Sequence, residues 1–317
     1  MWMSELPPFA PFFLAALLAL ITRGKLRGGL MVAAPLLGGL HLWFDVPAGT
    51  LYSVSLLEFE LQLLRVDKLS LVFGYIFHIA AFIMAIYTLH LKDTLQHVSG
   101  QVYVGSAIGA VFAGDLITLF IFWELLTISS VFLIWARRNM RSSRAGIRYL
   151  VFQVTSGVLL LAGALVYYQY TGSLAFGFIG LENAGGWLIL LAFGIKSAFP
   201  FLHNWLTDAY PEATPTGAAV LSVFTTKVAI YALARGFPGT ELLIYIGAVM
   251  TCFPIFYAVI ENDLRRVLSY SLINQLGFMV TGIGIGTALA LNGAIAHAFS
   301  HILYKSLLFM SMGAVLY

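Results

Sequence analysis

Two long apolar runs of the sequence each contain a lysine, Lys196 in the first and Lys227 in the second. Pro200 breaks the first run four residues after its lysine. A charged side chain at the centre of a bilayer costs about 2.5–3.5 kcal/mol on insertion scales, so a lysine there indicates a functional site. A proline break frees backbone carbonyls, which is tolerated only inside protein or beside water. The segment 194–235 is therefore predicted to form part of a polar path through a membrane.

A third apolar run, LITLFIFWELLTISSVFLIW, contains the carboxylate of Glu124, followed by the hydroxyls of Thr127 and Ser130, which can hold water. Either a neighbouring helix satisfies this carboxylate as part of packing, or the carboxylate belongs to a proton or ion relay, the commoner role of such groups. Lys196 is its natural partner, because both groups can stay charged when paired, whereas burial disfavours each charge when they separate. A lysine whose proton affinity depends on its partner can take up and release a proton. Lys227 would be the next acceptor, and its position near mid-helix disfavours snorkelling to the interface.

The last apolar run, AIAHAFSHILYKSLLF, carries His297, His301 and Lys305 at i, i+4 and i+8, so all three project from one helical face. Imidazoles that titrate near neutral pH, followed by a lysine, favour a proton wire. Core packing and a metal site are the alternatives, and no carboxylate or cysteine accompanies the pair on this helix. Ser300 lies close by in the sequence. These three side chains, His297, His301 and Lys305, form a histidine/lysine file. Further hydrogen bonds to this file could come from Ser271, Asn274 and Gln275.

Two other histidines carry less information. His203 follows Pro200 at the point where the broken helix would reopen toward the cytoplasm, and it could cap freed carbonyls or move protons. His78 stands alone on an apolar helix, which is more typical of a structural histidine than of a functional one.

Composition places the whole chain in a membrane. Of its 317 residues, 60% are hydrophobic and 10% are charged, and the mean hydropathy is +0.91. A soluble domain has about 45–50% apolar and about 25% charged residues. Continuous apolar runs indicate helices and disfavour a barrel. The single cysteine, Cys252, excludes a disulfide framework, and the net charge of +3 lies in loops, which indicates topology and no nucleic-acid partner.

The fold class predicted is an all-α polytopic membrane protein with about eleven transmembrane helices in one domain. The expected spans are 7–22, 28–44, 67–91, 100–114, 116–136, 146–170, 185–208 (broken at Pro200), 213–235, 240–260, 264–287 and 289–316. The fourth is short for a membrane span. The first is expected to be a retained helix, because no basic segment precedes it as in a signal peptide. Alternating residues predict that 45–66 forms a hairpin at the membrane surface.

Orientation follows from the basic residues. The loops after the first, third, fifth and ninth spans hold eleven of them, and the opposite side holds Arg65, Lys68 and Arg235. This bias predicts that the N-terminus is outside and that the turn 208–212 is cytoplasmic. The eleven are Arg23, Lys25, Arg27, Lys92, Arg137, Arg138, Arg141, Arg144, Arg148, Arg265 and Arg266.

These residues together resemble the antiporter-like subunit family, which includes the proton-pumping membrane subunits of respiratory complex I and the large subunits of Mrp-type cation/proton antiporters. The similar stretches, within 101–317, are FWELLTISSVFLIW, GIKSAFPFLHNWLTDAYPEATPTGAAVLSVFTTKVAIYALARGFPG, ENDLRRVLSYSLINQLGFM and IAHAFSHILYKSLLF. The phrase DAYPEATPTGAAVLSVFTTK is most similar to Mrp D subunits. By this resemblance, Glu124, Lys196 and Lys227 match the family's helix-5, helix-7 and helix-8 charges. His297, His301 and Lys305 match its helix-11 file.

The resemblance implies two inverted five-helix repeats, each a half-channel, joined by a central polar axis. It divides the chain into 1–99 (three N-terminal helices and the hairpin 45–66), 100–235 (the first half-channel) and 240–317 (the start of a second, incomplete repeat). Family members have further helices, including a second broken helix with another charge. Another polypeptide is expected to supply these helices, or the chain is a truncated paralogue, or a neighbouring subunit completes the path.

The leading hypothesis is a proton-translocating subunit of a multisubunit Na⁺/H⁺ antiporter in the plasma membrane, an ion-translocating protein with no cofactor or metal and no enzyme activity of its own. Its expected partners are other membrane subunits, protons, a monovalent cation and the lipid bilayer. Alternatives are a subunit of a complex I-like NADH/quinone or hydrogenase complex, a subunit that energises bicarbonate uptake, and a truncated non-conducting scaffold. A metal enzyme using His297 and His301 is weaker, and the sequence does not identify the cation.

Overall fold

The computed structural model describes residues 6–49, 51–56 and 59–316. The expected position of the N-terminus and the turn of the hairpin at 57–58 lie outside the described residues. Within these ranges the chain forms twelve α-helices, two short 3₁₀ helices and two strands. In order they are α1 (Ala10–Ile21), α2 (Gly24–Phe44), β1 (Leu51–Leu56), β2 (Phe59–Arg65), α3 (Lys68–Tyr87), η1 (Thr88–His90), α4 (Thr94–Phe112), α5 (Leu116–Trp135), α6 (Met140–Thr171), α7 (Ala184–Lys196), α8 (Asn204–Ala209), η2 (Tyr210–Glu212), α9 (Pro215–Gly236), α10 (Leu242–Ile260), α11 (Leu264–Ile285) and α12 (Ala288–Leu316).

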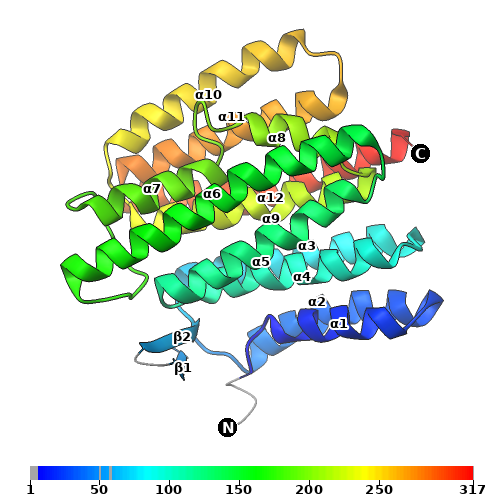
Figure 1. Cartoon of the computed structure of the whole chain (residues 1–317), viewed down its shortest axis with the longest axis horizontal. Coiled ribbons are helices and arrows are strands. Elements are labelled where there is room, and N and C mark those ends of the chain that lie inside the picture. The colour runs from blue at the N-terminus through cyan, green and yellow to red at the C-terminus, as the bar shows by residue number, and fades with distance from the viewer. Residues whose placement is uncertain (1–5, 50, 57–58, 317) are drawn as a thin grey trace.

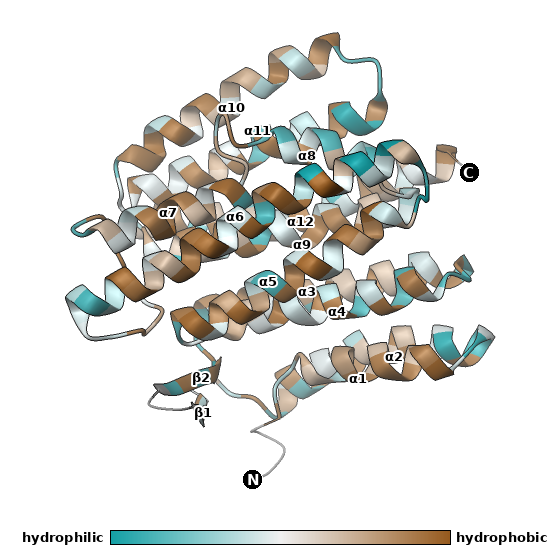
Figure 2. Cartoon of the chain, viewed as in Figure 1, coloured by the Kyte–Doolittle hydropathy of each residue, from teal (hydrophilic) through white to brown (hydrophobic). Residues whose placement is uncertain are grey.

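The long helices lie side by side as a bundle, with the hairpin at one end (Figure 1). Hydrophilic residues gather toward the helix ends and apolar residues cover much of their length (Figure 2). Helix α9 lies at the centre, because every residue of its most apolar segment is buried by α3, α4, α5, α7, α11 and α12. The predicted all-α membrane fold is thereby confirmed. Seven of the described helices are long and apolar enough to cross a membrane, so the number of eleven spans remains a prediction.

The fourth helix begins earlier than the sequence analysis expected. Asp93 accepts a hydrogen bond from the backbone N–H of Leu95 and caps a helix that starts at Thr94 instead of residue 100. An N-cap aspartate of this kind satisfies one of the unpaired N–H groups of the first turn. With its 19 residues, α4 is not unusually short.

The break in the seventh expected span comes before the proline. Helix α7 ends at Lys196, and the N–H of Phe199 bonds to the carbonyl of Gly194 while that of Ala198 bonds to Ile195. These two bonds form a Schellman motif, in which Ala198 adopts a left-handed conformation with φ of 64°. That conformation costs a non-glycine residue about 1–2 kcal/mol. Pro200 disfavours helix at the residue before it, so the chain turns here and resumes as α8 at Asn204.

The hairpin predicted within 45–66 is present, with β1 antiparallel to β2. Strand β2 is joined to the turn between α4 and α5, because the N–H of Gln62 bonds to a carboxylate oxygen of Asp115 at 2.6 Å and the N–H of Gly114 bonds to the Gln62 carbonyl at 2.9 Å. A side chain at Gly114 would collide with Gln62, so only glycine permits this approach. Asp115 also caps α5. The hairpin thus fastens one end of the bundle.

Asp67, the N-cap of α3, lies just outside that helix and forms an ion pair with Arg235 of α9 at 2.7 Å. Partial burial alone would raise the pKa of Asp67, but hydrogen bonds from Arg235 and the Ser70 N–H, with the charges of Arg235 and Arg65, lower it to about 2. A carboxyl with a lowered pKa stabilises the fold above its ordinary pKa of 3.8, and this contribution is lost as the pH falls toward 2.

We therefore expect Asp67→Asn, which retains the helix cap but removes the charge, to lower the free energy of unfolding by roughly 1–2 kcal/mol at pH 6. Thermal unfolding of both proteins in detergent should show this difference narrowing strongly by pH 2.5. If the two proteins differed in their free energy of unfolding by the same amount at pH 6 and at pH 2.5, the ion pair would not be the source of the difference.

The opposite end of the bundle holds the basic loops. Arg137 pairs with Glu212 at 3.0 Å and Arg148 with Asp208 at 2.6 Å. Arg138, in turn, pairs with Asp93 at 3.2 Å. The acidic turn after α8 therefore lies at the same end as the basic residues that follow α5, as the sequence analysis predicted from their order along the chain.

Candidate functional site

Lys196, the last residue of α7, is completely buried. Its ammonium group donates hydrogen bonds to the hydroxyl of Thr127 at 3.0 Å and to the carbonyl of Trp123 at 3.2 Å, both on α5. It also lies 4.5 Å from the centroid of the Trp123 ring. The indole N–H donates to Ser156 of α6 at 3.0 Å, which fixes the ring. Lys196 is therefore held by neutral oxygen acceptors and an aromatic face.

Glu124 does not form an ion pair with Lys196. None of the ion pairs within 4.0 Å in the described part of the chain joins these two residues, although their charges interact electrostatically. The carboxylate lies against Gly157 of α6, and its Oε1 atom is buried without a hydrogen-bond partner among the described residues. The sequence analysis correctly placed a carboxylate near the lysine, but the direct pair that it expected is not formed here.

We expect Gly157→Ala to displace the Glu124 carboxylate, because a Cβ atom at position 157 would collide with Oε1. The carboxylate is the far end of a flexible side chain, so it can rotate away while the helices stay packed. If Glu124 acts as a proton donor or acceptor from this position, proton flux that depends on it should fall by about tenfold.

The matched control is Gly100→Ala on α4, where an added Cβ meets nothing within 4 Å. Both variants should assemble normally by gel filtration. Equal proton flux in the Gly157→Ala and Gly100→Ala variants would mean that the position of Glu124 against α6 is not needed for proton transfer.

Three buried tyrosines lie between α5 and α9, and the sequence analysis missed them. The hydroxyl of Tyr149 is 2.7 Å from that of Ser130, and the hydroxyl of Tyr103 is 2.7 Å from that of Thr225. Tyr210 donates to the backbone carbonyl of Leu221, one turn before Thr225, at 2.9 Å. Thr225 also interacts with the hydroxyls of Tyr149 and Tyr210. These hydroxyls form a polar connection from the Lys196 region to the centre of α9.

Lys227 lies two residues after Thr225 on α9 and is completely buried. Its ammonium group donates to the backbone carbonyl of Ser222 at 2.6 Å, on its own helix. The hydroxyl of the adjacent Thr226 is buried and has no partner among the described residues. The snorkelling alternative is wrong, because this lysine lies inside the bundle.

The file on α12 begins next to α9. The ammonium group of Lys305 donates to the hydroxyl of Ser271 on α11 at 2.7 Å, a partner that the sequence analysis named. His301 is fully buried, and neither ring nitrogen has a hydrogen-bond partner among the described residues. The rings of His301 and His297 lie 6.1 Å apart and nearly parallel, at 19°. Lys227 interacts electrostatically with Lys305 and His301, so the charge on α9 affects the charges on α12.

Three residues expected to support the path lie elsewhere or play a local part. Ser300 is exposed and bonds to carbonyls of its own helix. The ring of His203 lies 4.7 Å from that of Phe253 on α10, and its Nδ1 atom has no partner among the described residues. Pro200 lies in the loop between α7 and α8.

Gln153 of α6 is a further polar residue that the sequence analysis overlooked. It is fully buried one turn before Gly157, and neither its amide oxygen nor its nitrogen has a partner among the described residues. Buried polar groups are normally satisfied, so this glutamine stands out on the same face of α6 as Gly157. Its only signal in the sequence is a lone amide in an apolar helix.

The chain matches known proteins over the same helices. Residues 113–317 match the family described as NADH:quinone oxidoreductase/Mrp antiporter, TM. The chain is 34% identical over 226 residues to the D subunit of the Na(+)/H(+) antiporter of Alkalihalophilus pseudofirmus, covering 65% of this chain and 46% of that protein. It is 33% identical over 229 residues to the N subunit of the NADH-quinone oxidoreductase of Desulforudis audaxviator, covering 66% and 46%.

A chain in the structure of the Mrp complex from Dietzia sp. DQ12-45-1b superimposes with a TM-score of 0.89 and 29% identity, covering 97% of this chain and 37% of that one. The present chain thus spans about half the length of the curated relatives it matches. The inverted-repeat fold with a broken seventh helix, expected from the family resemblance, is confirmed by these similarities. The family match covers well over half of the chain, and the chain belongs to the NADH:quinone oxidoreductase/Mrp antiporter transmembrane family.

Proposed function

We propose that this protein moves protons through the membrane as a subunit of a multisubunit monovalent cation/proton antiporter, exchanging Na⁺ for protons. The observation that carries the proposal is the state of two lysines, Lys196 and Lys227, which are fully buried and, among the described residues, hydrogen-bonded only to neutral oxygens. A buried ammonium group without a bonded carboxylate is held weakly enough to lose its proton when the local field changes.

In the proposed cycle, the Glu124 carboxylate approaches Lys196 and stabilises its protonated form, then withdraws to the position beside Gly157. The proton leaves Lys196 along the hydroxyls of Thr127, Ser130 and the three tyrosines, with water completing the gaps, and reaches Lys227. Hydrogen-bonded hydroxyls can accept one proton while donating another, as such transfer requires.

From Lys227 the proton passes to the α12 file. Two ammonium groups that interact electrostatically repel each other, so protonation of Lys227 favours release of a proton from Lys305. His301 and His297 then carry the proton onward along α12.

The proposal extends to the assembly. Residues 100–235 form the first half-channel and 240–317 the start of the second, with 1–99 beside them. Other membrane subunits of the same complex take part in the path in the plasma membrane. The basic end of the bundle faces the cytoplasm and the hairpin faces outward. In this arrangement the protein is an ion-translocating subunit and not an enzyme.

A second function is favoured by the similarity to a relative named as the N subunit of an NADH-quinone oxidoreductase. In that case the same proton path is driven by redox chemistry in other chains. Pull-down of the tagged protein from membranes, with identification of the companion subunits, separates the two proposals.

Transport is then measured in inverted vesicles that contain the assembled complex. If the complex is an antiporter, adding Na⁺ should dissipate an imposed pH gradient without any electron donor. A gradient that forms only with NADH or another reductant would favour the redox complex. Unchanged transport by Glu124→Gln would instead indicate a non-conducting scaffold.

A further inference from the structure

A strongly basic pocket lies between the start of α2, η1 with the loop after it, and the start of α4, away from the buried lysines. Its volume is about 770 Å³, within the usual range for ligand pockets. Four cationic side chains line it, and none of its lining residues is acidic. The four are Arg23, Lys25, Arg27 and Lys92.

The positive-inside bias explains why basic residues occur at this end, but not why these four are left without carboxylates. Arg137, Arg138 and Arg148, at the same end, each form an ion pair with an acidic side chain. No ion pair within 4.0 Å among residues 6–49, 51–56 and 59–316 includes any of the four pocket cations. The neighbouring carboxylate, Asp93, is engaged by Arg138 and does not line the pocket.

The start of α2 adds to the positive potential. No side chain caps this helix, and its first turn contains no acidic residue. Cations at a helix N-terminus oppose the helix dipole by about 0.3–1 kcal/mol each. Lys25 and Arg27 nevertheless occupy this place, and Arg27 is buried and fixed by bonds to the Thr22 carbonyl and the Thr94 hydroxyl. An anion in the pocket would relieve this unfavourable arrangement.

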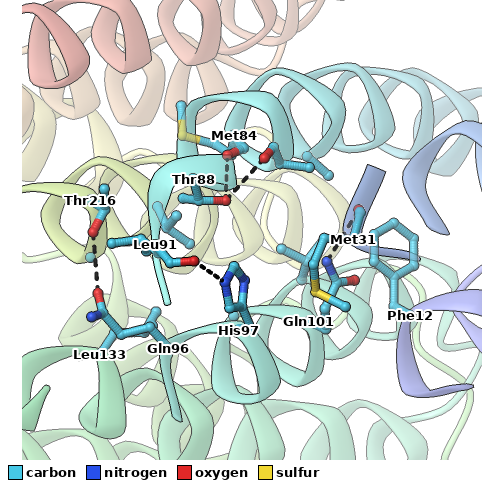
Figure 3. Close-up of a pocket in the computed structure, with 16 residues that line it drawn as sticks. Phe12, Met31, Met84, Thr88, Leu91, Gln96, His97, Gln101, Leu133 and Thr216 are labelled. Carbon is cyan, nitrogen blue, oxygen red and sulfur yellow. Dashed lines mark hydrogen bonds between the residues drawn. The ribbon is translucent and has the colours of Figure 1, made fainter. Parts of the chain in front are cut away.

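The inner end of the pocket adjoins a second, smaller space. His97 and Leu91 line both this pocket and a small internal cavity of about 40 Å³. A ring nitrogen of His97 lies 3.1 Å from the Leu91 carbonyl, and Figure 3 shows this contact among the residues that line the small cavity. Four positive charges also repel cations. The pocket is therefore suited to an anion, and not to the entry of Na⁺.

The outer rim is apolar. Leu89 lines the pocket and is 49% exposed, and Leu26, in the first turn of α2, is 65% exposed. Helix α3, which is long and apolar enough to span a membrane, ends beside the pocket at Tyr87. Glycines at 24, 28 and 29 leave the floor open, and an added Cβ at Gly24 or Gly29 meets nothing within 4 Å. A phosphate group in this pocket could thus have acyl chains beside it.

We propose that this pocket binds the phosphate headgroup of an acidic phospholipid, with the acyl chains lying along Leu26 and Leu89. Free inorganic phosphate shares the anionic chemistry, but it would gain nothing from the apolar rim. Basic pockets between membrane helices on the cytoplasmic side bind headgroups of this class.

The proposal is tested on the purified full chain in a neutral detergent. Native mass spectrometry measures the affinity for phosphatidylglycerol and for phosphatidylcholine with the same acyl chains. We expect Lys25→Gln with Lys92→Gln to weaken phosphatidylglycerol binding by about 25-fold, at about fivefold for each basic residue removed. Lys25→Arg with Lys92→Arg should retain the affinity.

Arg141→Gln with Arg144→Gln is the matched control, because both arginines are exposed on α6 and outside the pocket. We expect this variant to bind phosphatidylglycerol within about twofold of the unmodified protein. Gly29→Leu fills the pocket without changing any charge, and it should weaken the binding of phosphatidylglycerol as well. Gel filtration and circular dichroism confirm that each variant is folded.

Three results would overturn the proposal. The control variant could lose as much affinity as the pocket variant, which would indicate diffuse electrostatic attraction. Phosphatidylcholine could bind as tightly as phosphatidylglycerol. Inorganic phosphate could displace the lipid completely at equal concentration, which would identify a free anion as the ligand.

Discussion

Replacing Lys196 with alanine is expected to reduce proton transport by the assembled complex by about 100-fold or more, to the level of empty vesicles. The variant lacks the group that is proposed to carry the proton, and among the described residues no other titratable side chain bonds to Thr127 and Trp123. Fluorescence of a pH-sensitive dye in inverted vesicles measures the loss.

Assembly is expected to survive this substitution, since α7 keeps its packing against α6 and α9. Lys68→Ala is the matched control, because Lys68 is exposed beside the hairpin and takes no part in the path. Normal transport by Lys196→Ala, with the complex intact, would remove this lysine from the mechanism.

Replacing His301 with leucine is expected to lower transport by roughly 10- to 100-fold while leaving the fold as stable as before or more so. His301 is fully buried and neither of its ring nitrogens has a partner among the described residues, so an apolar side chain removes an unsatisfied polar group. Transport and thermal unfolding of the same preparation measure the two effects.

His78→Leu provides the comparison for this variant. His78 is also buried, but its Nδ1 bonds to the Gly74 carbonyl at 2.7 Å, and its ring packs against Phe12 away from the path. Its replacement should destabilise the fold and leave transport per assembled complex unchanged. A clear loss of stability in His301→Leu, with full transport, would make His301 a structural residue.

Several parts of the site could be predicted because charges are costly in apolar surroundings. Lys196 and Lys227 stand out in the sequence for that reason, and both are buried in the bundle. The spacing of His301 and Lys305 at i and i+4 predicts that they share one face, and Ser271, expected as a partner from the sequence, bonds to Lys305.

Other parts depend on the rotation of helices about their axes, which the sequence pattern does not give. Lys196 approaches α5 on the face of Trp123 and Thr127, which are one turn apart. Glu124 lies about 100° further round the same helix and faces Gly157 of α6. A run that is apolar on all sides offers no stripe from which this rotation could be read.

The tyrosines were missed for a related reason. Tyr103, Tyr149 and Tyr210 lie in apolar surroundings where a tyrosine is an ordinary core residue. Their hydroxyls come near Thr225 only after α4 and η2 pack against α9 and α6 packs against α5. The end of α7 was also misplaced, because the strongest signal was Pro200. The turn begins earlier, at Ala198. This residue adopts a left-handed conformation although it is not a glycine, so the sequence carries no signal for the turn.

The most direct test is to replace Lys196 with arginine and to measure Na⁺-driven proton flux in inverted vesicles that contain equal amounts of assembled complex. Arginine keeps the positive charge and can bond to the same oxygens, but it does not release its proton in proteins. If Lys196 takes up and releases a proton in each cycle, flux in this variant falls to the level of Lys196→Ala. Flux near that of the unmodified protein would show that only the charge is needed, and it would contradict proton transfer through Lys196.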